Sequence, residues 1–226
     1  MRHVLAAIAF LVACRPVAAD APEKPPEQRF ERDMMLRFHM HQNFDLVRAI
    51  ERLLVRGKLE EAARFAEAIA QAPVEAPAHG PWATHVVAVR DRALAVARAT
   101  TVEDALRKET RLAVACAGCH RDSAAIVFAK PPAAPPDRAT IDARMARHRW
   151  AADRLWEAIV GDADDAWRAG LDVLAATPLE LGPERAPLAR ELQRLATAAR
   201  RAPASADRAA TYAELLVTCA ACHSRR

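Results

Sequence analysis

The sequence predicts an all-α protein that consists of two tandem antiparallel four-helix bundles. Three observations support this fold class: the composition, the spacing of the apolar residues and an internal duplication. Of the 226 residues 52% are hydrophobic, many of them Ala, whereas aromatic residues make up only 5% and there are six Gly. Ala is the strongest helix former, and β-branched and aromatic residues are the ones that enrich strands. The composition therefore favours packed helices over a sheet.

The first half of the chain shows helical periodicity with clear breaks. After a flexible, Pro-containing lead-in at 20–29, apolar residues recur every three or four positions through 30–56, which indicates one buried helix face. Gly57 is placed to end this helix as a left-handed cap. Thr100, followed three residues on by a glutamate, is expected to cap the fourth helix in a capping box. The second and third helices are expected at 59–72 and 82–98.

The second half repeats this pattern after a linker. The Pro-rich segment 130–136 cannot be helical and reads as a short, stiff spacer. Apolar positions then recur at helical spacing from Ile141 to Ile159, and Gly161 is expected to end that helix. Further helices are expected at 163–175, at 184–200 and after Pro203.

The two halves are an internal duplication. Met40 pairs with Met145 at an offset of 105, and Cys116 pairs with Cys219 at an offset of 103. The helix breaks pair in between: Gly57 with Gly161, and Gly80 with Gly182. A chance match would not keep helix starts, breaks and motifs in register together. The bundles are accordingly assigned to residues 30–129 and 137–226.

Both halves end in the same pentapeptide pattern, Cys-x-x-Cys-His, at 116–120 and 219–223. This is the attachment signature of a c-type haem. On a helix, positions i, i+3 and i+4 share one face, so both thiols can form thioethers along one porphyrin edge while the imidazole faces the iron. The sequence therefore predicts two covalent haem c groups. The predicted attachment residues are Cys116, Cys119, Cys219 and Cys222, and the predicted iron ligands are His120 and His223.

Other readings of the motifs and of the charge are less well supported. Each motif could instead form a disulfide or half a zinc site, but zinc would need further Cys or His partners that the remaining histidines do not supply. The sequence pI of about 9.0 does not indicate nucleic-acid binding, because no basic patch interleaved with aromatics occurs. No Ser-His-Asp set, Gly-rich phosphate loop or paired-carboxylate motif is present, so an enzyme is not predicted.

The N-terminus reads as an export signal. Arg2 precedes an apolar stretch at 4–13 that is too short to span a bilayer. Cleavage at a small-residue site would make 1–19 a signal peptide, whereas a lipobox-like sequence would leave 1–13 as the signal and Cys14 as a lipidated N-terminus. Either route predicts a periplasmic protein, with membrane association only through Cys14.

Four antiparallel helices with Cys-x-x-Cys-His near the end of the fourth resemble the class II cytochromes c, the group that includes cytochrome c′. The resemblance covers 31–125 and 137–226. It implies that His120 and His223 are proximal iron ligands and that the first helix of each half faces the distal side of the haem. That distal residue is a Met ligand in six-coordinate members of the family and a non-ligating residue in cytochrome c′. The chain lacks the aromatic residue that usually follows the motif and resembles a tandem, divergent member.

Met40 and Met145 occupy equivalent positions on the inward face of their helices. A thioether is a soft ligand that raises the potential of haem iron, although a Met on an apolar face can also be core filler. His148, one turn after Met145, is the alternative distal ligand and would lower the potential of the second haem. Asn43 stands at the equivalent position of the first half and cannot replace it.

The sequence thus predicts an exported dihaem carrier that transfers electrons between redox partner proteins. The alternative is binding of a small gas ligand, NO or CO, at a five-coordinate iron. A haem peroxidase ranks below both, because no clear distal acid-base set is present. The haem-free chain is expected to fold poorly, and replacing Cys116 and Cys119 with Ser is expected to lose one haem and melt the first half.

Overall fold

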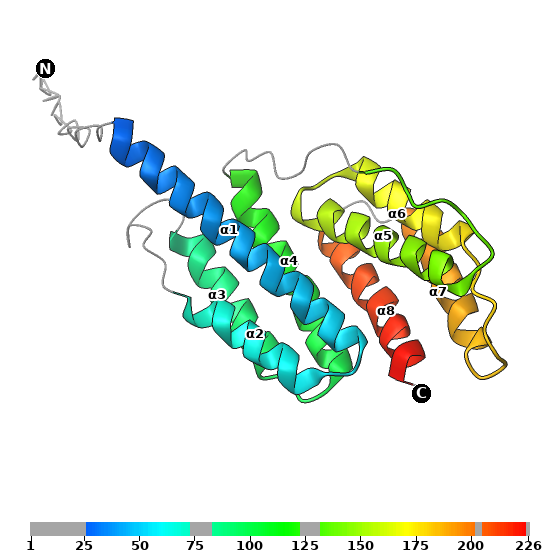
Figure 1. The fold of residues 1–226 in the computed structure, drawn as a ribbon. Helices are drawn as coiled ribbons and strands as arrows, with labels where there is room; N and C mark the ends of the chain where they lie inside the picture. Colours follow the sequence, from blue (N-terminus) through cyan, green and yellow to red (C-terminus); the bar gives the residue numbers. More distant parts are fainter. Residues whose placement is uncertain (1–25, 73–82, 123–131, 202–204, 225–226) are drawn as a thin grey trace, which may run out of the picture. The chain divides into compact units, whose positions relative to one another are not determined.

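The structure is a computed structural model that describes residues 26–72, 83–122, 132–201 and 205–224, and all of its regular structure there is helical (Figure 1). The prediction of an all-α fold is confirmed. The helices are α1 Pro26–Val55, α2 Leu59–Gln71, α3 Ala83–Ala97, α4 Val102–Asp122, α5 Ile141–Val160, α6 Asp164–Ala176, α7 Ala186–Ala198 with a short 3₁₀ turn at Ala199–Arg201, and α8 Ser205–Ser224. The predicted signal segment with Cys14, and parts of the lead-in and the linker, lie outside the described residues.

The chain divides into two compact units, Met1–Phe38 and His39–Arg226. The described residues of the first unit belong to α1, which begins at Pro26, earlier than the predicted start at residue 30. Proline suits the first helical position, because its missing N–H would have no intrahelical partner there. No helix in the described ranges is both long enough and apolar enough to cross a membrane. Every contact discussed from here on lies within the second unit.

α1 ends as the sequence predicts, in a left-handed cap. Gly57 has a φ of 76°, and its N–H donates to the carbonyl of Leu54 at 2.9 Å. The N–H of Lys58 donates to the carbonyl of Leu53 at 2.9 Å. These two bonds form a Schellman motif, which satisfies carbonyls that the helix itself leaves unpaired.

The prediction that Gly161 ends its helix is confirmed, because α5 stops at Val160 and Gly161 is its C-cap. The left-handed residue is the next one, Asp162, with a φ of 52°, and the N–H of Ala163 donates to the carbonyl of Ala158 at 3.1 Å. Asp is among the non-glycine residues that tolerate this conformation. Asp162 follows Gly57 at the same offset that relates Met145 to Met40, so the first helices of both halves align without a gap.

The left-handed cap allows a direct stability test. Gly57→Ala is expected to destabilise the fold by about 1–2 kcal/mol, the cost of holding an L-residue in this conformation. The added Cβ meets nothing within 4 Å, so the loss is one of backbone strain alone. Gly182 also has open space around it but no left-handed φ, and Gly182→Ala is the matched control. Urea denaturation measures both, and equal midpoints for the two variants contradict the prediction.

α4 begins one residue later than the predicted cap implies. The N-cap is Thr101, whose Oγ1 accepts a hydrogen bond from the N–H of Asp104 at 3.1 Å. Thr100 and Thr101 are each followed three residues on by an acidic residue, so spacing alone could not separate them. The helix starts at Val102, and this start makes Thr101 the cap.

Successive helices pack against each other in each half. α2 packs against α3 and α3 against α4, while α5 packs against α6, α6 against α7, and α8 against both α7 and α5. α5 and α6 approach closely at Gly170, where a Cβ would lie 2.9 Å from the Ala151 carbonyl oxygen and from Leu155. α4 contacts both α8 and α5 and thereby joins the two halves.

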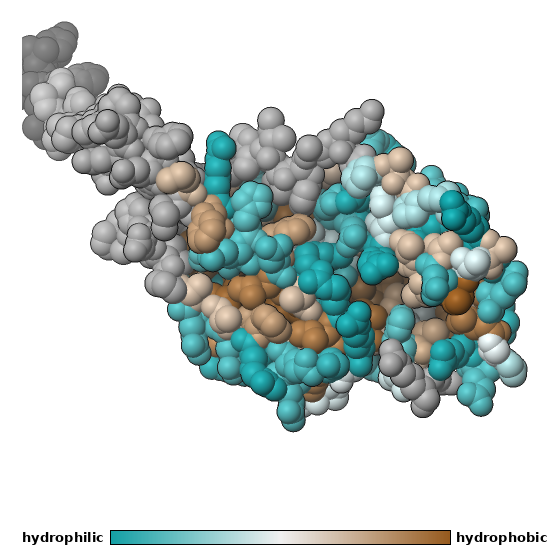
Figure 2. Space-filling view, in the orientation of Figure 1, coloured by the Kyte–Doolittle hydropathy of each residue, from teal (hydrophilic) through white to brown (hydrophobic). Residues whose placement is uncertain are grey.

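The described part of the predicted linker lies along α5. The indole N–H of Trp150 donates to the carbonyl of Pro132 at 3.1 Å, and the Arg147 guanidinium donates to the carbonyl of Pro135 at 2.6 Å. On the surface, Figure 2 shows an apolar band along α1 and α2 between hydrophilic side chains. Phe65 on α2 and Val87 on α3 are among the large hydrophobic side chains that remain exposed.

Candidate functional site

The two predicted motifs occupy the last turns of α4 and α8. Their four cysteines are partly buried and are not joined in a disulfide. α4 and α8 pack against each other and run in opposite directions, as Figure 1 shows. The ion pair of Arg107 with Glu214, at 3.0 Å, marks the level at which the two helices face each other. The structure therefore keeps the two motifs apart, at opposite ends of this helix pair.

The first thiol of each motif is held in its neutral form. Burial raises the pKa of Cys116 to about 12, and the neighbouring thiol of Cys119 and the carboxyl of Glu109 add to the effect. Burial likewise raises the pKa of Cys219 to about 12, with a contribution from the carboxyl of Glu51. Metal binding by cysteine requires the thiolate, which a raised pKa disfavours.

The imidazole of His120 is oriented by a backbone carbonyl from the other half. Its Nδ1 lies 3.2 Å from the carbonyl oxygen of Val160, at the end of α5. A carbonyl oxygen only accepts hydrogen bonds, so Nδ1 carries the proton and Nε2 carries the lone pair. Burial lowers the pKa of His120, while the bond to Val160 opposes that shift. This tautomer, held at Nδ1 by a carbonyl, is the one that metal-ligating histidines commonly adopt.

Met40 is half-buried on α1, which runs antiparallel to α4 in Figure 1. Glu51 on α1 and Glu109 on α4 are close enough for the charge of one to raise the pKa of the other. Met40 precedes Glu51 by as many residues as His120 follows Glu109. In antiparallel helices with equal rise, Met40 and His120 therefore lie toward the same end of the helix pair.

Met145 holds the corresponding place in the second half. It is half-buried on α5, which packs against α8. The hydroxyl oxygen of Tyr212 on α8 lies 3.0 Å from the carbonyl oxygen of Ala152 on α5. Met145 precedes Ala152 by as many residues as Cys219 follows Tyr212. The methionine thus lies at the level of the motif that ends in His223.

His148, the alternative distal ligand, has a structural partner. It is buried, and its Nε2 lies 2.9 Å from the carbonyl oxygen of Thr177, which follows α6. Because the carbonyl accepts, Nε2 carries the proton. Burial lowers the pKa of His148, the bond to Thr177 opposes this, and the charge of Arg147 adds to it. Ligation of iron through Nε2 would have to replace this hydrogen bond.

A further histidine, on α3, contacts the first motif. His85 on α3 lies 2.8 Å from the carboxylate of Asp122, measured from its Nε2. Its ring also lies beside Gly118, where an added Cβ would meet it at 3.7 Å, an ordinary contact distance. The second motif carries Ala221 at the position of Gly118, in keeping with room for a methyl group. His85 thus packs against the first motif and is bonded to the end of α4.

A buried polar cluster joins the two halves, and sequence reasoning missed it. The guanidinium of Arg48 on α1 donates to Glu51 at 2.6 Å and also to Asp153 on α5. The hydroxyl of Tyr212 on α8 donates to Glu51 at 2.8 Å. Arg48 also lies over the ring of Trp156, 5.5 Å from its centroid. The cluster therefore ties α1 of the first half to α5 and α8 of the second.

One contact in this cluster joins repeat-equivalent positions. Asp153 follows Arg48 by 105 residues, the offset that also relates Met145 to Met40. Such a contact is what a two-fold relation between the two copies would produce. α1 and α5 thus meet at equivalent positions.

A second pair of contacts follows the same symmetry. Glu51 is equivalent to Trp156, and Glu109 is equivalent to Tyr212, by the offsets of their helices. The carboxylate of Glu51 accepts from the Tyr212 hydroxyl, and the indole of Trp156 lies close enough to Glu109 to lower the pKa of its carboxyl. Each carboxyl thus lies near one aromatic side chain that carries an O–H or N–H group. A comparison of equivalent positions in the two halves of the sequence could have revealed this cluster.

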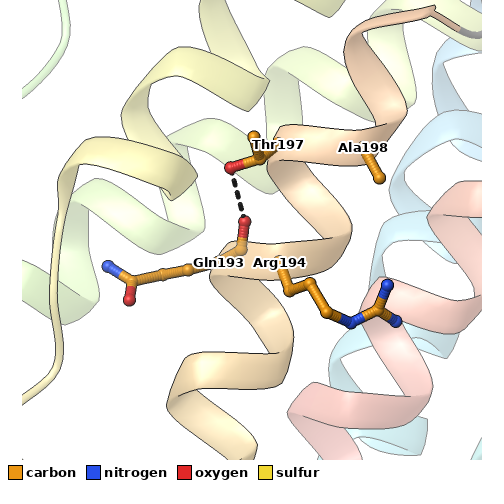
Figure 3. Close-up of a pocket in the computed structure, with 4 residues that line it drawn as sticks. All are labelled: Gln193, Arg194, Thr197 and Ala198. Carbon is orange, nitrogen blue, oxygen red and sulfur yellow. Dashed lines mark hydrogen bonds between the residues drawn. The ribbon is translucent and has the colours of Figure 1, made fainter.

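The described part of the chain has two surface hollows, one on α7 and one between α3, α4 and α8. The first, of about 530 Å³, is lined by Gln193, Arg194, Thr197 and Ala198 on one stretch of α7, where the Thr197 hydroxyl donates to the Gln193 carbonyl at 2.8 Å (Figure 3). None of the predicted site residues lines it. The second, of about 440 Å³, runs between α3, α4 and α8 over a floor of alanines, and Arg92, Arg107 and Arg111 are among its lining residues. Within the described ranges, no three His, Cys, Asp or Glu side chains gather as a metal site.

Fold and site together define an all-α chain with two equivalent Cys-x-x-Cys-His helix ends and a shared buried polar cluster. Comparisons of the chain with protein-family models, with curated proteins and with solved structures found no match. The function is therefore inferred from the residues of the chain itself.

Proposed function

We propose that this chain is an exported c-type cytochrome of two tandem four-helix bundles, which carries two covalent haems and transfers electrons between redox partner proteins. The observation that carries the proposal is the repeated motif: Cys-x-x-Cys-His ends α4, and ends α8 at the equivalent place. Helix α8 also starts 103 residues after α4, the offset that separates the two motifs. Whole helices and motifs were therefore duplicated together.

The donor sets suit a haem. The thiols are not joined in a disulfide and stand three residues apart on a helix, the spacing of two thioether bonds on one face. The tautomer of His120 leaves Nε2 with the lone pair, and Met40, toward the same end of the helix pair, could supply a thioether from across the bundle. When bound, haem supplies one-electron chemistry, and the protein sets its potential through ligands, burial and nearby charge. Export follows from the predicted signal at 1–19 and is part of the same proposal.

The test is to express the full chain in a bacterial host that attaches c-type haem in its periplasm. We expect the mature protein to gain the mass of two haems and to keep its colour after acidic extraction with an organic solvent, because thioethers are covalent. Mass spectrometry and a pyridine haemochrome assay count the haems. A colourless chain in a host that matures a control cytochrome contradicts the proposal.

The distal ligand has its own test. We expect Met40→Ala to remove the sulphur-to-iron charge-transfer band of one haem and to convert that haem to high spin, because a soft ligand is lost. Met34 on the same helix is more than half exposed, at 53%, so Met34→Ala is the matched control. Optical and electron-paramagnetic-resonance spectra give the readout. High-spin iron already present in the native protein contradicts Met ligation and favours the alternative, binding of NO or CO at a five-coordinate iron.

A further inference from the structure

Glu109 is a buried acid that neither the motifs nor the predicted ligands use. Its side chain on α4 has 0% exposure, and neither carboxylate oxygen forms a hydrogen bond of normal geometry. Such a group costs a protein about 1–3 kcal/mol or more when it stays unpaired. Glu109 lies on the same face of α4 as Cys116, two turns before it, and its charge acts on that thiol. The burial of this carboxyl so close to the first motif therefore needs a physical explanation.

The surroundings of Glu109 favour a neutral carboxyl. Burial raises its pKa well above the ordinary value, and the negative charge of Glu51 on α1 raises it further. Arg48 on α1 and the indole of Trp156 on α5 lower it, but Arg48 is already engaged with Glu51 and Asp153.

Two further titratable groups of the neighbouring helices have hydrogen-bond partners of their own, although the charge of Glu109 acts on one of them, Tyr212. Tyr212 on α8 is hydrogen-bonded to Glu51, and burial raises its pKa well above the ordinary value. On α3, the Arg90 guanidinium donates to the carbonyl of Ala72. A change of charge nearby can therefore decide whether Glu109 is protonated.

We propose that Glu109 is a redox-linked proton site, which binds a proton when an electron enters the haem held by Cys116 and Cys119 and releases it when the electron leaves. The inference rests on the proposed function. On reduction, a one-electron donor supplies the electron to iron, and bulk water supplies the proton that forms an O–H bond on Glu109. On oxidation both leave. The pair adds no net charge to the buried interior, where an isolated charge is costly.

The sign of the effect follows from this coupling. The added electron makes the proton bind more tightly, so reduction is easier where protons are abundant. The potential of the first haem should therefore fall as pH rises through the titration of Glu109. The slope approaches about 59 mV for each tenfold change in proton concentration if one proton accompanies each electron. The window lies above the ordinary titration range of a glutamic acid, because burial and the charge of Glu51 raise the pKa of Glu109.

The experiment is a spectroelectrochemical titration of the full dihaem chain at a series of pH values, together with redox-difference infrared spectra. In Glu109→Gln, which is neutral at every pH, we expect the potential of the first haem to stay at the low-pH value of the native protein. The protonated carboxyl band that appears on reduction should also be missing. Glu109→Asp should restore a pH-dependent potential, and Glu103→Gln, in the exposed first turn of α4, should behave as native.

Each remaining outcome has one meaning. If Glu109→Gln keeps the native pH dependence while Glu51→Gln loses it, the proton site is Glu51 and the inference is wrong. If the dihaem chain shows no pH dependence at all, the inference is wrong while the proposed function stands. A chain that carries no haem overturns both together. Far-ultraviolet circular dichroism of each variant establishes that its helices are intact.

Discussion

Replacing Cys116 and Cys119 together with Ser is expected to halve the haem content, because Ser cannot form the two thioethers of the first motif. The structure also indicates which part of the protein should lose stability. The first and second halves share the cluster around Arg48 and Glu51, and α4 packs directly on α8. A first half that loses its haem should therefore lower the unfolding temperature of the whole unit His39–Arg226 in one transition. Mass spectrometry and thermal unfolding by circular dichroism measure the two effects.

Matched variants separate haem loss from a general effect of removing cysteine. Cys219→Ser with Cys222→Ser should leave the other haem and lower the unfolding temperature in the same way. Cys14→Ser removes the only cysteine outside the motifs and should leave two haems. Retention of both haems by the Cys116 and Cys119 double variant would contradict the assignment of the first motif. An unchanged second half that melts separately would contradict the shared unit.

Arg48→Met is expected to destabilise the fold by about 3–5 kcal/mol, the cost of removing one partner from a buried ion pair. Arg48 is the cation between Glu51 and Asp153, and it also lowers the pKa of Glu109. Burial already raises the pKa of Glu51 against the opposing effect of Arg48. Without the guanidinium, Glu51 has to stay charged in a buried site or take up a proton.

The deficit of Arg48→Met should depend on pH in a defined direction. Because the folded-state pKa of Glu51 lies above its unfolded value of 4.5, the folded chain binds more protons in the interval between them. Stability therefore falls as pH rises through that interval, and the deficit should be smallest near its acidic end. Chemical denaturation of both proteins across this range measures it. Adding Glu51→Gln should recover much of the loss, Arg64→Met on the exposed face of α2 is the control, and a pH-independent deficit contradicts this account.

The helices could be predicted closely because their signals are local. The spacing of apolar residues, the breaks at Gly57 and at the prolines, and the repeat between the halves each act over a few turns of chain. Predicted and observed helix bounds accordingly differ by a few residues at most. The error at Thr100 has a local cause: two neighbouring threonines could each serve as the cap, and only the backbone of the folded chain selects one of them.

The motifs were likewise readable from sequence, because haem attachment depends on three residue types within five positions. The distal candidates were reached by comparing the halves, but their levels relative to the motifs depend on how α1 and α4 pack. The hydrogen bond that ties His148 to Thr177 links residues 29 positions apart, and no local pattern marks it. Such pairings follow from helix packing rather than from spacing along the chain.

By itself, the sequence determined the all-α class, the duplication and the two Cys-x-x-Cys-His motifs, since composition, periodicity and short motifs are properties of neighbouring residues. Only the tertiary structure decided that Arg48 meets its own repeat equivalent, Asp153, and that Glu109 lies buried beside the same cluster. In sequence, Glu51 and Glu109 look like ordinary charges on helical segments. Their burial depends on the packing of the two halves, which joins residues more than a hundred positions apart.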